Sequence, residues 1–359
     1  MGKTNQDYSE ALDWVRFTLN PEMTMPRISN WREVYDFCDK QKITGVCEPT
    51  RFDVHVDEDV LLDWLALVYS LRKNGDIINH RIADLFQILY RDGIPCCLLK
   101  GQGNALMYPD PLMRIPGDID IWIDKDKREL DDYFIQKFPD SKQSFKHLKV
   151  WYEGTPVDAH DTPLKLYHPK HNKYLQEWIL SQKEEQFDHQ AALFGTDMLI
   201  PVPTPAFNAV YQMGHIMIHL LDEGVGLRHI IDYYYVLKNL DSMTEAEKQG
   251  IRDVWHKLGM FKLATGIMWI EREILGLPQG LLLVPPDEKR GRLLLEDILE
   301  GGNFGKMSKR QIIKKKGFLF KGVVLALHNL KLCSLYPAEI PYKLIAKVKT
   351  FFRHFTRKI

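Results

Sequence analysis

The segment from Leu98 to Ile123, LLKGQGNALMYPDPLMRIPGDIDIWI, contains the residue types best suited to chemistry. Asp118 and Asp120 are separated by one residue in an apolar stretch, so on a strand their carboxylates point to the same face. Like charges this close raise one another's pKa unless a cation lies between them. Oxygen ligands of this kind suit Mg²⁺, which also binds substrate phosphates. With Lys100 and Arg114 available for those phosphates, the segment predicts metal-assisted phosphoryl or nucleotidyl transfer.

Several short strands and turns must position these residues. The apolar run 94–99 predicts a buried strand before a glycine loop that opens a short helix near Ala105. The strand that carries the aspartates is predicted over 118–123, with a helix over 125–138 after it. The ranges 145–153 and 155–160 predict two further strands, joined by a turn at Gly154.

Helical periodicity surrounds this sheet on both sides. Helices are predicted before it over 57–74 and 77–93, and after it near 172–183, 205–222, 226–240, 244–258, 260–275 and 287–299. The fold class is therefore α+β, a small mixed β-sheet core with N-terminal and C-terminal helical segments. We predict four regions: helical 1–92, the core 93–165, a helical domain 166–305 and a basic helical tail 306–359.

The order of motifs resembles the nucleotidyltransferase superfamily with the DNA polymerase beta-like fold. The superfamily signature is a Gly-Gly or Gly-Ser turn, a spacer and then Asp-x-Asp or Asp-x-Glu on a strand. Asp118-Ile119-Asp120 matches the strand, and the turn corresponds to Gly103-Asn104 or, with a longer spacer, to Gly101-Gln102, neither of which has the second Gly or Ser. Within it, the chain resembles a poorly characterised bacterial family with a Lys-Gly loop, a downstream Arg and an acid-x-His strand. Lys100-Gly101, Arg114 and Asp158-Ala159-His160 match those features.

The resemblance implies a role for each matching residue. Asp118, Asp120 and Asp158 would be catalytic and would hold two Mg²⁺ ions, with Mn²⁺ as an alternative, about 3.5–4 Å apart. Asp158 would also accept the proton of the acceptor hydroxyl. Nucleotide contacts would come from five residues: Lys100, Gly101, Gly103, Asn104 and Arg114. His160 would orient a carboxylate or touch the acceptor, and a weaker match extends to Arg228 and Asp232 on a later helix.

Simpler interpretations of the same residues stay open. Asp161 and Glu153 compete with Asp158 for the third carboxylate position, and Arg114 could simply pair with Asp118. His215 and His219, at i and i+4, have zinc-ligand spacing, but a packed core pair is favoured because no HExxH pattern is present.

The predicted function is a Mg²⁺-dependent transfer of a nucleoside monophosphate from an NTP, such as ATP, with release of pyrophosphate. The acceptor would be a hydroxyl or phosphate of a sugar, a small molecule or a protein. The alternative is a catalytically inactive nucleotide-binding or partner-binding module with the same fold.

Composition limits the environment and the partners. The five cysteines form no CxxC pair, the first residues contain no apolar signal segment, and prolines interrupt the uncharged stretch 198–221. A cytoplasmic location is therefore expected. The net charge of zero hides a basic tail, since 306–359 contains fourteen Lys and Arg and one acid. This tail suggests an anionic membrane surface at the inner face or an acidic partner, with nucleic acid a weaker alternative, unless it folds back onto the acidic body.

Overall fold

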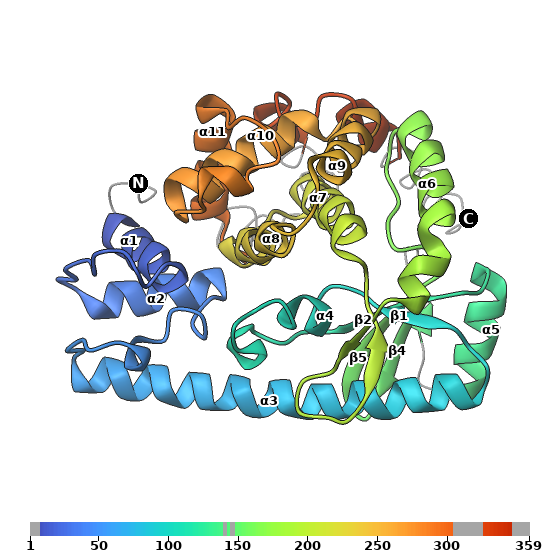
Figure 1. Cartoon of the computed structure of the whole chain (residues 1–359), viewed down its shortest axis with the longest axis horizontal. Helices are drawn as coiled ribbons and strands as arrows, with labels where there is room; N and C mark the ends of the chain where they lie inside the picture. Colours follow the sequence, from blue (N-terminus) through green and yellow to red (C-terminus); the bar gives the residue numbers. More distant parts are fainter. Residues whose placement is uncertain (1–7, 139–141, 144–147, 304–325, 347–359) are drawn as a thin grey trace, which may run out of the picture. The chain divides into compact units, whose positions relative to one another are not determined.

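The computed structural model describes residues 8–138, 142–143, 148–303 and 326–346 (Figure 1). The chain divides into two compact units. The first unit contains Met1–Lys42, Leu164–Glu177 and Ala209–Ile359, and the second contains Ile43–Pro163 and Trp178–Asn208. The predicted division into four regions at 92, 165 and 305 stays a prediction.

The second unit is built on a five-stranded mixed sheet with strand order β1-β2-β5-β4-β3. Its strands are β1 (Cys96–Leu98), β2 (Ile119–Ile123), β3 (Lys142–Gln143), β4 (Leu148–Tyr152) and β5 (Thr155–His160). Strand β2 runs antiparallel to β1 and parallel to β5, which places it inside the sheet. All five residues of β2 are buried, as expected for an interior strand.

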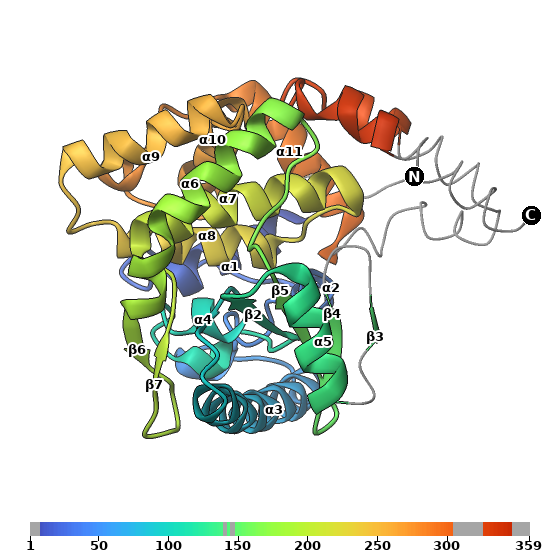
Figure 2. The ribbon, with the colours of Figure 1, turned by 90° about the vertical axis from the view of Figure 1, so that its right-hand side faces the viewer.

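Two helices cover one face of this sheet: α3 (Glu58–Arg91) and α5 (Lys127–Lys137). Figures 1 and 2 show α3 running along the sheet. Their apolar side chains form one core with the inward residues of the strands; this core includes Ile82, Phe86, Leu89, Ile119, Ile121, Ile123, Phe134, Val157 and Ala159. The other face is partly covered by aromatic rings, since the ring of Trp122 lies 5.0 Å from that of Phe187 and 5.8 Å from that of Phe207.

The helix α3 corrects one sequence prediction. The ranges 57–74 and 77–93 were predicted as two helices, but the structure has one continuous helix of 34 residues. Gly75 lies inside it, where a Cβ would be only 3.1 Å from Leu112 Cδ2. The glycine therefore permits a close approach to a neighbouring segment and does not break the helix. The predicted stop is confirmed, because Gly93 has φ +67° directly after the helix ends.

The remaining parts of the second unit are short. They are the 3-10 turns Pro49–Arg51 and Pro111–Met113, α4 (Gln102–Ala105), and a hairpin of β6 (Gln190–Ala192) and β7 (Leu199–Pro201). The hairpin was not predicted, because strands of three residues are too short to show a periodicity. Helices α6 (Pro169–Asp188) and α7 (Pro205–Asp222) contribute residues to both units.

The first unit is helical. It contains α1 (Ser9–Leu19), α2 (Trp31–Gln41), α8 (Leu227–Asn239), α9 (Glu245–Lys257), α10 (Phe261–Trp269), the π-helical turn Ile270–Ile274, the 3-10 turn Gln279–Leu281 and α11 (Glu288–Gly301). Gln41 ties α2 to the C-terminal helices, because its Nε2 donates to Ile298 O at 3.2 Å and its Oε1 accepts from Leu227 N at 2.9 Å. The helical-plus-small-sheet composition confirms the predicted α+β class.

Part of the basic tail belongs to the interior of the first unit. Lys343 has a fully buried side chain whose Nζ lies 3.0 Å from Asp222 Oδ1. Glu339 accepts hydrogen bonds from the backbone N–H groups of Tyr167 and His168. Lys343 is therefore not available for an anionic surface. The clusters Lys314–Lys316, Lys347 and Lys349 lie outside the described residues. Across the described helices, none combines the length and apolarity needed to cross a membrane.

Candidate active site

The register of two parallel strands places the predicted carboxylates side by side. Asp120 of β2 is the direct neighbour of Asp158 on β5. Along both strands, alternate residues face the apolar core, as Ile119 and Ile121 do in β2 and Val157 in β5. Both aspartates therefore lie on the opposite face of the sheet. Asp118 directly precedes β2 and is exposed.

Three aspartates form one cluster. Asp118, Asp120 and Asp158 each offer a carboxylate oxygen, and these oxygens all lie within 4.8 Å of one another. Asp120 is only 3% exposed and Asp158 only 6%. This is the one group of three or more His, Cys, Asp or Glu side chains with metal-ligand spacing within the described ranges, and it contains neither Asp161 nor Glu153. Of the three candidates for the third carboxylate, Asp158 is the one that lies in this cluster, and its role stays a prediction.

Asp120 is held by two donors. Lys100 Nζ lies 2.8 Å from Asp120 Oδ1, and His160 Nε2 lies 3.1 Å from the same oxygen. Because a carboxylate only accepts hydrogen bonds, His160 must donate through Nε2–H. The His160 ring thus contacts a carboxylate, and both predicted roles, orienting that carboxylate and touching the acceptor, stay predictions.

The charges in the cluster keep both members of the lysine–aspartate pair ionised. Burial alone would raise the pKa of Asp120, but Lys100 and the His160 contact outweigh it and hold this pKa well below its ordinary value. Burial would likewise lower the pKa of Lys100, yet Asp120, Asp118 and Asp158 together raise it. These interactions therefore favour the charged form of Lys100 beside the carboxylates.

The glycine loop joins β1 to α4 with a backbone that requires glycine. Gly101 has φ +52°, and a Cβ there would lie 3.3 Å from Asp118 O. A Cβ on Gly103 would lie 3.1 Å from Leu98 O. Gly101 therefore lets the loop lie close to the start of β2, and Gly103 lets it lie close to the end of β1. This explains the two glycines without a nucleotide, and their predicted phosphate contact stays a prediction.

Asn104 and its neighbour Gln102 point into the protein. Asn104 is 2% exposed and its Oδ1 accepts from Asn208 Nδ2 at 3.3 Å. Gln102 is 4% exposed and donates from Nε2 to Asn79 Oδ1 at 2.6 Å. These amides fix the short helix α4 to α3 and to the start of α7. A nucleotide contact by the side chain of Asn104 would compete with this interior bond.

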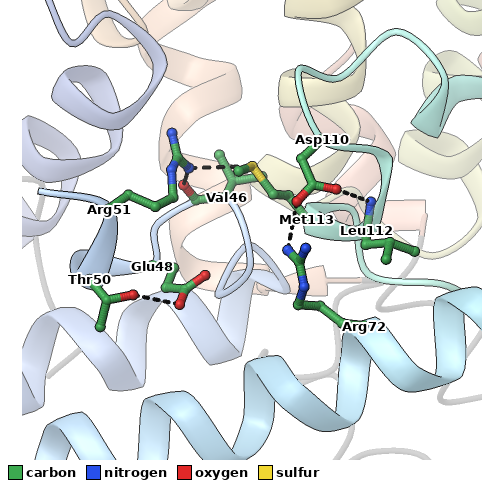
Figure 3. Close-up of polar contacts among 8 residues, drawn as sticks. All are labelled: Val46, Glu48, Thr50, Arg51, Arg72, Asp110, Leu112 and Met113. Carbon is green, nitrogen blue, oxygen red and sulfur yellow. Dashed lines mark hydrogen bonds and ion pairs between the residues drawn. The ribbon is translucent and has the colours of Figure 1, made fainter.

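Arg114 follows a tightly fixed turn (Figure 3). Asp110 caps the 3-10 turn Pro111–Met113 by accepting from Leu112 N at 3.0 Å, and its other oxygen lies 2.6 Å from Arg72 Nη1 of α3. Arg51 donates to Val46 O at 2.9 Å and contacts Met113 Sδ at 3.4 Å. The turn that leads into Arg114 is therefore anchored from two sides.

The Arg114 side chain itself is 5% exposed, and its Nη1 donates to Ile115 O at 3.3 Å. Its burial gives the guanidinium a fixed position in the second unit. Sequence reasoning missed the anchoring residues Arg72 and Asp110, because the partners are 38 residues apart. The local signal was Asp110 directly before Pro111, which is a typical cap before a proline at the first helical position.

Arg228 and Asp232 lie on α8, in the first unit. The same unit contains His215 and His219 on α7, whose rings are 4.3 Å apart. Both histidines are half-buried and belong to no metal-spaced group in the part of the chain that the structure describes, and the packed core pair stays a prediction. The acceptor contact of Arg228 and Asp232 stays a prediction.

Comparison with known protein families shows the family to which the chain belongs. The family model described as uncharacterised nucleotidyltransferase matches residues 28–276, which is more than half of the chain. The chain belongs to this nucleotidyltransferase family. The match includes the glycine loop, the three aspartates and α8.

Other comparisons add little to this assignment. No curated protein matches the chain. A nucleotidyltransferase-like antigenic protein from Paracoccidioides brasiliensis is a solved structure with 14% sequence identity, covering 52% of this chain and 88% of its own. Its TM-score is 0.29, which is too low to bear on the fold.

The donor set of this nucleotidyltransferase fits a divalent cation. Three carboxylates supply hard oxygen ligands, and two of them are buried, where like charges are costly without a counter-ion. Lys100 provides one positive charge against three negative ones. Asp118, Asp120 and Asp158 are therefore the residues that would hold Mg²⁺ or Mn²⁺.

Proposed function

We propose that this chain is an active nucleotidyltransferase that moves a nucleoside monophosphate from an NTP to a hydroxyl or phosphate oxygen of an acceptor. The observation that supports the proposal most strongly is the aspartate cluster, with ligand oxygens within 4.8 Å of one another on one face of the sheet. Bound Mg²⁺ would supply charge neutralisation at the triphosphate and activation of the acceptor oxygen.

The side chains of the second unit have separate tasks in this reaction. An acceptor oxygen forms a bond to the α-phosphorus, the bond from that phosphorus to the bridging oxygen breaks, and pyrophosphate leaves with the bonding electrons. Asp158 takes the proton of an acceptor hydroxyl. His160 keeps Asp120 in one orientation through the contact to Oδ1. Arg114 adds a fixed positive charge for the phosphates.

The proposal also names the nucleotide, the acceptor and the cellular location of the protein. We propose ATP among the NTPs and a sugar, small molecule or protein as acceptor, in the cytoplasm. The undescribed basic clusters of 306–359 would serve a peripheral contact with an anionic membrane surface or an acidic partner. Nucleic acid is the weaker candidate for that contact.

Substitution of Asp118 by Asn tests the function directly. Asp118 is exposed, so the variant should fold like the wild type, but it loses one ligand charge of the cluster. Mg²⁺-dependent pyrophosphate release from each of the four NTPs, with a panel of acceptors, should fall by at least about 100-fold, since metal-held charge stabilisation contributes several kcal/mol. Transfer of label from an α-³²P NTP to the acceptor provides the second readout.

Asp132→Asn is the matched control, because Asp132 is a 75% exposed aspartate of α5 outside the cluster. It should keep full activity. Full activity in Asp118→Asn would show that the assigned role is wrong. Calorimetric binding of an NTP with Mg²⁺, without any pyrophosphate release by the wild type, would favour the inactive nucleotide-binding module.

A further inference from the structure

Lys100 occupies an unusual position for a lysine expected to bind phosphate. Its Nζ lies 2.8 Å from Asp120 Oδ1, and only 18% of its side chain is exposed. The charges of Asp118 and Asp158 also act on this ammonium. Its present partners are thus the carboxylates that would bind a metal ion.

The contact leaves part of the cluster available. Lys100 and His160 both approach Oδ1 of Asp120, so a metal ion that binds through Oδ2 would not require either contact to break. The ammonium and one divalent ion can therefore be present in the cluster together. Two divalent ions would have to compete with the ammonium for the same carboxylates.

The balance of formal charge favours the same arrangement. Three carboxylates and one ammonium leave two negative charges, which one divalent ion neutralises. A second divalent ion would leave a surplus of positive charge in a mostly buried site, where uncompensated charge is costly. The triphosphate of a bound nucleotide removes this obstacle, because it brings negative charge of its own.

We propose that Lys100 takes the place of a second divalent ion in the nucleotide-free protein, so that the aspartate cluster binds one divalent ion until a triphosphate arrives. When the nucleotide binds, the ammonium is released to a phosphate oxygen, which unites this role with the predicted phosphate contact. The inference rests on the proposed metal-dependent function.

The test is to count and titrate Mn²⁺ on the nucleotide-free full chain, using the electron paramagnetic resonance signal of free Mn²⁺. The wild type should bind one ion. Lys100→Met removes the positive charge that the proposal puts in place of a second ion. It should bind its first Mn²⁺ at least tenfold more tightly, because the repulsion is gone, and it should also bind a second. Lys183→Met is the matched control, because Lys183 forms a lysine–aspartate pair of the same 2.8 Å length with Asp124, outside the cluster. It should bind Mn²⁺ like the wild type.

A second substitution guards against misfolding of Lys100→Met. Lys100→Gln keeps a hydrogen-bond donor for Asp120 without the charge, and it should show the same gain in affinity. Circular dichroism confirms that each variant is folded. Two ions on the nucleotide-free wild type, or equal or weaker binding in both folded Lys100 variants, would overturn the inference.

The same titration distinguishes a protein that has no metal site from one in which only the role of Lys100 is wrong. If the wild type and both Lys100 variants bind no Mn²⁺ even with a non-hydrolysable NTP, the metal site itself is refuted and the inference falls with it. If wild-type binding is lost in Asp158→Asn but is unchanged in the Lys100 variants, the metal site stands and only the role of Lys100 is refuted.

Discussion

Asp120 and Glu271 are both buried, but their surroundings shift the pKa of the two carboxyl groups in opposite directions. Asp120, in the second unit, is 3% exposed and has Lys100 and His160 at one oxygen. Glu271, in the π-helical turn of the first unit, is fully buried, and neither of its oxygens has a hydrogen-bond partner in the described chain. The pKa of Asp120 lies well below its ordinary value, whereas burial raises that of Glu271 well above it.

The difference shows what keeps a buried carboxyl group ionised. Burial by itself turns an acid into a neutral group, because the charged form loses its hydration. A nearby cation and hydrogen-bond donors directed at the carboxylate keep it ionised in spite of burial. Glu271 is thus a polar group inside a packed core, while Asp120 is a buried carboxylate kept ionised by Lys100 and His160.

Removing the charge of Asp120 should have the largest effect. Asp120→Asn leaves the nearly buried Lys100 ammonium without its partner, and breaking a buried pair typically costs about 3–5 kcal/mol. The midpoint of urea unfolding, measured in EDTA at pH 7, should fall accordingly. Asp124→Asn is the control, since the Asp124–Lys183 pair at the end of the same strand is 39% and 28% exposed and should change stability by less than about 1 kcal/mol. Equal midpoints for Asp120→Asn and the wild type would contradict the comparison.

Replacing Glu271 should remove a fall in the free energy of unfolding with rising pH. A carboxyl with a lowered pKa, such as Asp120, has the opposite effect. The unfolded chain loses the Glu271 proton above about pH 4.3, while the folded chain keeps it, so a higher pH favours unfolding. Between pH 5 and pH 7 the wild type should lose at most about 1.4 kcal/mol per pH unit relative to Glu271→Gln. Thermal unfolding at several pH values measures the difference.

Glu273→Gln provides the control, because Glu273 belongs to the same turn but is 45% exposed. Its pH profile should follow that of the wild type. Parallel profiles for the wild type and Glu271→Gln would mean that Glu271 is ionised or solvated in the folded protein.

A half-exposed pair should have the smallest effect on stability. Arg72 and Asp110 are 40% and 24% exposed, so water screens their attraction, and Arg72→Met should cost no more than about 1 kcal/mol. Because the pair anchors the turn before Arg114, a severalfold drop in pyrophosphate release is still expected. Arg128→Met, which removes a 92% exposed arginine from α5, should change neither quantity. An unchanged rate in Arg72→Met would show that the turn holds Arg114 without the pair.

Periodicity in the sequence was sufficient to predict the centre of the sheet. The alternation around Asp118 and Asp120 predicted a shared face, and Ile119 and Ile121 indeed lie in the core on the other side. The predicted strands over 145–153 and 155–160 correspond to β4 and β5, with the turn at Gly154. These features are local, so the order of side chains along the strand determines them.

Contacts between distant residues could not be predicted in the same way. The Lys100–Asp120 pair depends on how β1, its loop and β2 come together, and the Arg72–Asp110 pair depends on the packing of α3. The continuity of α3 was missed because Gly75 looks like a helix breaker until Leu112 is seen against it. Such pairs follow from tertiary packing, which no short spacing pattern records.

Asp120 and Asp158 are neighbours across parallel strands, and parallel neighbours cannot be joined by a tight turn. The chain therefore makes a long excursion through α5, β3 and β4 before β5 returns beside β2. A divalent ion held by the proposed cluster would bind only after this return, so it would shift the folding equilibrium toward chains in which β5 is paired with β2. Binding of an ion at these two aspartates would thus report that the parallel pairing of β2 with β5 has formed.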